Sequence, residues 1–61
     1  MSNLSVKIKI FKNYSIINLQ RDVNDFCIDK QVVNVSYSTE KDEYNTCHYV
    51  CVAYKNYEVS I

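Results

Sequence analysis

Three segments of the chain have the alternating or two-sided apolar pattern of β-strands. Residues 4–11 and 33–38 place an apolar side chain at every second position, which predicts strands with one half-buried face. Residues 46–54 differ, because apolar or aromatic side chains occur on both faces. A strand of that kind needs a packing partner on each side. Its two rows are Cys47, Tyr49, Cys51 and Ala53 on one face, and His48, Val50, Val52 and Tyr54 on the other.

One helix is predicted between the first two strands. Apolar residues recur there at spacings of three and four, at Ile16, Leu19, Val23, Phe26 and Cys27. This stripe predicts an amphipathic helix over about residues 15–29, with Asn13 or Ser15 as the N-cap. The polar residues 40–45 predict a hairpin loop that joins the second and third strands.

The predicted fold class is α+β, with the order β-α-β-β in one small domain of residues 1–61. A right-handed crossover through the helix makes the first two strands parallel. The third strand returns antiparallel, and we expect it in the centre because it is the most apolar. The result is a three-stranded sheet of order 1-3-2. Tyr57, Val59 and Ile61 alternate again, which fits either a short fourth strand or an arm that reaches a partner.

The apolar faces of this sheet predict a homodimer. One helix covers only one face, and a chain of this length buries only about 60% of the surface that it exposes when unfolded. We expect His48, Val50, Val52 and Tyr54 at the dimer interface, although the pattern leaves open which row meets the helix. In the first strand we expect Leu4, Val6, Ile8 and Ile10 to face the core.

Exposed charges and aromatic side chains are the candidate contacts to a further partner. Surface residues of these types commonly anchor protein partners. The candidates are Lys7, Lys9 and Phe11 on the exposed face of the first strand, and Glu40, Asp42, Glu43 and Tyr44 in the hairpin loop.

Composition argues against several classes of function. The chain contains no glycine, so a glycine-rich phosphate loop is impossible, and its net charge of zero argues against nucleic acid. Cys47, His48 and Cys51 resemble a metal motif, but on a strand the two thiols lie about 13 Å apart and His48 points away. We therefore expect no metal, no cofactor and no catalytic residue. Three cysteines, no signal segment and no membrane span predict reduced thiols in a cytoplasmic protein.

Four segments resemble a family of very small proteins of Firmicutes and their phages. These are residues 6–11, 23–26, 32–39 and 49–54. Some members are described as small sporulation proteins, and the size and order of elements also resemble the small phage inhibitors of the Hachiman defence system. The resemblance implies a compact homodimer that binds and blocks a bacterial protein complex in the host cytoplasm, and it carries no catalytic residues. The alternatives are a host sporulation or regulatory protein, and a protein that binds single-stranded nucleic acid or sequesters nucleotides.

Overall fold

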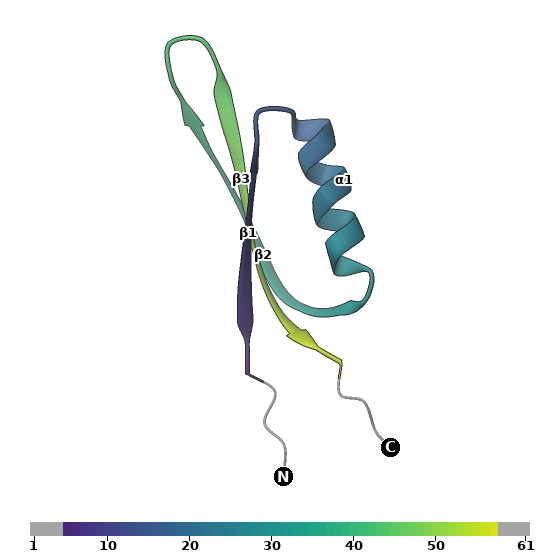
Figure 1. Cartoon of the computed structure of the whole chain (residues 1–61). Helices are drawn as coiled ribbons and strands as arrows, with labels where there is room; N and C mark the ends of the chain where they lie inside the picture. The colour runs from purple at the N-terminus through teal and green to yellow at the C-terminus, as the bar shows by residue number, and fades with distance from the viewer. Residues whose placement is uncertain (1–4, 58–61) are drawn as a thin grey trace.

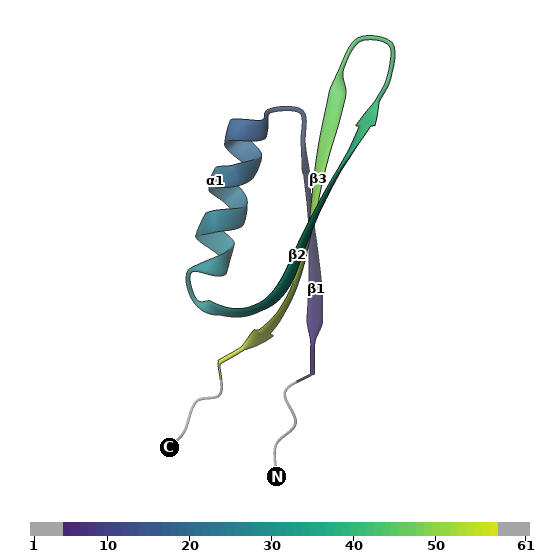
Figure 2. The same ribbon diagram turned by 180° about the vertical axis from the view of Figure 1, so that it is seen from behind.

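The computed structural model describes residues 5–57, which form one sheet and one helix. The elements are β1 (Lys7–Asn13), α1 (Ile16–Cys27), β2 (Lys30–Lys41) and β3 (Thr46–Asn56). β3 lies between β1 and β2 and is antiparallel to both. α1 lies against one face of the sheet (Figures 1 and 2). The predicted α+β fold, its strand order 1-3-2 and its single helix are therefore confirmed. Leu4, Val59 and Ile61 lie outside the described residues.

The start of α1 is defined by two polar side chains in the preceding turn. Ser15 is the N-cap, and its Oγ accepts a hydrogen bond from the backbone N–H of Asn18 at 3.3 Å. Oδ1 of Asn13 accepts one from the backbone N–H of Ser15 at 2.9 Å. Both candidates from the sequence thus contribute, but the cap itself is Ser15. A serine cap of this kind stabilises a helix by about 1 kcal/mol relative to alanine.

The core is small and lies between α1 and the central strand. Leu19 of α1 and Val50 and Val52 of β3 are buried, and Val52 is 0% exposed. Two edge-to-face aromatic contacts extend this cluster along the sheet. The ring centroids of Phe26 and Phe11 are 5.4 Å apart, and those of Phe26 and Tyr54 are 5.0 Å apart.

The faces of β1 are opposite to those expected from the sequence. Phe11 pairs with Val50 and Lys9 with Val52, so the row of Lys7, Lys9 and Phe11 lies on the helix side. Paired residues of antiparallel strands share a face, and a shift of one residue would turn every side chain over. The physical reason is Phe11, whose ring packs against Phe26 beneath the helix, where a shorter aliphatic chain would leave space.

The helix-facing row of β3 is His48, Val50, Val52 and Tyr54. Val50 and Val52, which we expected at a dimer interface, lie instead against α1. Val50 and Val52 are buried by α1 within one chain, and Tyr54 packs against the same cluster. Side chains already covered by the helix offer no surface to a second copy. The row left uncovered is the opposite one, which runs from Cys47 to Ala53.

The β2–β3 hairpin projects past the helix and past the end of β1 (Figure 1). β2 continues to Lys41, so Glu40 belongs to the strand and the loop is shorter than predicted. Asp42 closes the loop, because its Oδ1 accepts hydrogen bonds from the backbone N–H groups of Tyr44 at 2.9 Å and Asn45 at 2.7 Å. These bonds hold the pKa of the Asp42 carboxyl below its usual value, since they stabilise the charged form.

Candidate interaction surfaces

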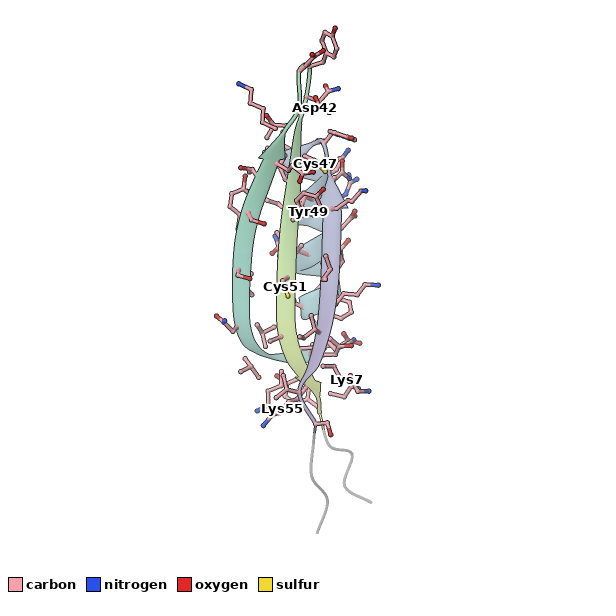
Figure 3. All side chains as sticks on the ribbon, turned by 90° about the vertical axis from the view of Figure 1, so that its left-hand side faces the viewer. Lys7, Asp42, Cys47, Tyr49, Cys51 and Lys55 are labelled. Carbon is pink, nitrogen blue, oxygen red and sulfur yellow. The ribbon has the colours of Figure 1, made fainter. Side chains whose placement is uncertain are left out.

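The sheet face opposite α1, here called the open face, carries an apolar strip on β1 and β3. Ile8 pairs with Ala53 and Ile10 pairs with Cys51, which places all four side chains on this face. Ile8 and Ile10 are each 65% exposed. Figure 3 looks onto the open face, with Cys47, Tyr49 and Cys51 following one another along β3 and the helix behind the sheet. Two isoleucines that remain this exposed beside each other indicate a surface for a partner.

A polar border and opposite charges surround the apolar strip. On β2 the open face carries Asn34, Ser36 and Ser38, which pair with Ala53, Cys51 and Tyr49. Toward the hairpin, the β2 position opposite Cys47 is Glu40. Toward the other end of β3, alternation places Lys55 on the same face. On β1, Lys12 pairs with Tyr49 and so lies on this face near Glu40. The open face is therefore apolar at its centre, carries both a negative and a positive charge toward the hairpin, and is basic at the other end.

Tyr49 contacts Glu40 at the hairpin end of the open face. Its hydroxyl donates a hydrogen bond to Oε1 of Glu40 at 3.4 Å. Interactions with the neighbouring Cys47 side chain, followed by the negative charge of Glu40, raise the pKa of Tyr49 to about 12. The phenol therefore stays protonated well above the usual range for tyrosine, and it remains a donor to its neighbours. Cys47 itself is buried although it lies on this face.

A second apolar surface lies on the helix side, as a groove between α1 and β2. Its volume is about 390 Å³. Ile16, Leu19 and Val23 of α1 form one wall, and Val35 and Tyr37 of β2 form the other. The floor is Val50, and the amides of Gln20 and Asn24 lie along the helix rim. The groove exists because α1 leaves the inner face of β2 uncovered, where Val35 and Tyr37 are about half exposed.

Tyr37 is held in place as a wall of this groove. Its hydroxyl oxygen and Nδ1 of His48 are 2.6 Å apart, and the two rings are stacked with centroids 5.9 Å apart. The direction of this bond depends on the His48 tautomer, because the Tyr37 hydroxyl donates when Nδ1 carries no proton and accepts when Nδ1 carries one. His48 therefore has a packing and orienting role beside Tyr37.

The partner-binding residues expected from the sequence fall in three places. Lys7, Lys9 and Phe11 were expected on the bare face, and this is wrong because all three lie on the helix side. Phe11 belongs to the core, whereas Lys7 and Lys9 are exposed and Nζ of Lys9 lies 5.7 Å from the Phe11 ring centroid.

The hairpin candidates remain at the surface, with distinct roles. Glu40 bonds to Tyr49, and Asp42 closes the turn. Glu43 and Tyr44 form the tip, and Tyr44 is 87% exposed. Sequence reasoning missed Ile8 and Ile10 as surface residues. The signal that could have found them is the aromatic Phe11 at the end of the lysine row, since a large ring favours the core side of a strand.

Cys27, Cys47 and Cys51 are free thiols. Across residues 5–57, no three histidine, cysteine or carboxylate side chains are grouped so that they could hold a metal ion. None of the helical segments described has the length and apolarity to cross a membrane. Comparisons with protein families, with curated proteins and with solved structures find no match to this chain.

Proposed function

We propose that this chain is a non-enzymatic binding protein that works as a homodimer, with the open faces of two copies packed together. The observation that carries the proposal is the exposed pair Ile8 and Ile10 on a sheet face that no element of residues 5–57 covers. Burying two such side chains from each copy supplies the apolar area that the small core of Leu19, Val50 and Val52 lacks.

Two charged residues of the open face, Glu40 and Lys55, favour a second copy as its partner. Face-to-face sheets pack about 10 Å apart. When the strands of the two sheets run in opposite directions, the Glu40 end of one copy lies over the Lys55 end of the other. The apolar strips then meet at the centre, near Cys51, and the two charged ends are brought together twice. The same surface is thus complementary to itself at Glu40 and Lys55, and Lys12 near Glu40 adds a third charge to it.

Light scattering on the purified chain tests this assembly. The dimer predicts twice the 7.2 kDa mass of one chain at micromolar concentration. Raising the salt concentration should weaken self-association moderately, because only the Glu40 and Lys55 contacts are screened. A particle that keeps the mass of one chain at every concentration tested would contradict the proposal.

The partner that we propose for this dimer is a bacterial protein complex. More specifically, we propose an anti-phage defence complex in the host cytoplasm. The resemblance to small phage inhibitors of the Hachiman system in chain length and order of elements supports this proposal. The test is a plaque assay on bacteria that carry this system, with and without expression of the chain. We expect expression to restore plaque formation. If the defence system still protects the bacteria from phage while the chain is folded and abundant, the inhibitor proposal is contradicted. The dimer is tested separately, by light scattering.

A further inference from the structure

We infer that β2 and the groove beside it form a binding site for an extended peptide segment of a protein partner, added to the sheet as a fourth strand. The segment would place aliphatic side chains in the groove at every second position. This inference deepens the proposed function, because it names the chemistry of the partner that the dimer binds.

The first support is the outer edge of β2. β2 is an edge strand of twelve residues, and within the described part of the chain nothing pairs with its outer backbone groups. An edge of this kind is a template for another strand, and charged side chains are a common protection against that. The other edge, β1, carries Lys7, Lys9 and Lys12 in seven residues. β2 has no charged side chain from Val32 to Thr39, so it is the less protected edge.

The second support is the position of the groove. Strands that join a sheet lie about 4.8 Å from their neighbour and direct alternate side chains to the same face. A strand added outside β2 would therefore direct every second side chain toward the helix side, over Val35 and Tyr37 and against Val23. Peptide-recognition domains that bind by strand addition use this combination, in which backbone bonds supply affinity and side-chain pockets supply specificity.

The lining of the groove defines which side chains fit. Its volume of about 390 Å³ lies within the range of about 300–1,000 Å³ that is usual for binding pockets. No charged residue lines it, so charged side chains would lose hydration there without a partner. Aliphatic side chains fit, and Gln20 and Asn24 on the rim can hydrogen-bond to polar groups of the segment.

Two features restrict where the segment would pair. The register of β2 against β3 is irregular between Val32 and Asn34, which interrupts the regular edge at that point. The regular edge from Asn34 onward is the part that flanks the groove. Within it, the Tyr37 ring is already oriented by His48, so binding would cost little ordering of this wall. In the proposed dimer the open faces are turned inward, which leaves both grooves accessible on the outside.

The experiment uses the full-length protein and a fluorescent nine-residue peptide in which leucine or valine alternates with glutamine or lysine. Anisotropy should show saturable binding. Two further peptides are N-methylated either at all apolar or at all polar positions. Since successive residues of a strand direct their N–H groups to opposite edges, only one of the two should lose binding, by about tenfold or more. Equal effects of the two methylation patterns, or no saturation up to about 1 mM, would overturn the inference.

A pair of tryptophan variants locates the site. Gln20→Trp places a large ring on the groove rim and should weaken peptide binding about tenfold or more. Ile17→Trp is the matched control, because Ile17 is exposed on α1 but does not line the groove. Its peptide affinity should stay within about twofold, and circular dichroism should show both variants folded. If Gln20→Trp changes the mass of the particle and leaves peptide binding intact, the groove is an interface between copies and the inference is wrong.

Failure of the peptide site and failure of the dimer are distinguishable. Ile10 lies on the open face, away from the groove, so Ile10→Lys should lower self-association and leave the peptide affinity per chain unchanged within about twofold. Loss of peptide binding in this variant would show that the peptide binds the open face. It would overturn the assignment of the peptide site to β2 and the groove beside α1.

Discussion

Replacement of Ile10 by lysine should convert the dimer to a monomer without unfolding the chain. Ile10 is 65% exposed in one chain, so its contribution to the core of that chain is small. Full burial of an isoleucine is worth about 1.5–3 kcal/mol, and burial of the remaining two thirds therefore about 1–2 kcal/mol. The two-fold symmetry of the dimer doubles this value to about 2–4 kcal/mol, or about 30- to 1,000-fold in the dissociation constant.

The assay is sedimentation equilibrium across a range of protein concentrations. Ile17→Lys is the matched control, because it makes the same substitution at an exposed isoleucine of α1 that lies away from the open face. Ile17→Lys should keep the dissociation constant of the natural sequence, and thermal melts should show that both variants fold. Equal effects of the two substitutions, or a fully dimeric Ile10→Lys variant, would refute the open face as the interface.

Three further predictions concern the core and two titrating groups. Leu19→Ala should lower the free energy of unfolding by about 2–5 kcal/mol in urea titrations, because Leu19 is buried between α1 and β3; a loss below about 1 kcal/mol would contradict this core. The pKa of Asp42 is lowered by hydrogen bonds from the backbone N–H groups of Asn45 and Tyr44. These bonds to the ionised carboxylate therefore stabilise the fold above the unfolded pKa of about 3.9, and the stabilisation is lost as the pH falls through the lower folded pKa. Carboxyl NMR titration checks this, and a midpoint at or above about 3.9 would contradict it. The pKa of Tyr49 is raised to about 12, so the contacts of its protonated phenol stabilise the fold below the unfolded pKa, and this stabilisation is lost as the pH rises through the folded pKa. Ultraviolet titration of Tyr49→Phe should lose a phenol that ionises near pH 12, and an unchanged curve would contradict the assignment.

The sequence predicted the architecture because its local patterns each allow few alternatives. The two apolar rows of residues 46–54 predicted a central strand, and β3 lies in the centre. The stripe from Ile16 to Cys27 predicted the one helix, and Ser15 caps it. These features depend on neighbours in the chain, so periodicity and capping chemistry were sufficient to infer them.

The orientation of the rows was less accessible, because alternation separates two faces of a strand without saying which one the helix covers. For β1 the count of aliphatic residues favoured the row of Ile8 and Ile10, whereas the contact of Phe11 with Phe26 beneath the helix favoured the other. The groove could not be predicted at all. It depends on where α1 lies across the width of the sheet, and no local pattern in the helix or in β2 encodes that lateral position.

The most direct measurement of the proposed assembly is an isotope-filtered NMR experiment on a mixed dimer. One copy carries ¹³C-labelled isoleucine methyl groups, and the other is unlabelled. The open-face dimer predicts intermolecular NOEs from Ile8 and Ile10 to protons of Cys51 and Ala53 in the unlabelled copy. Contacts from Ile16 alone, beside the groove, or no intermolecular contacts in a sample of dimer mass, would contradict it.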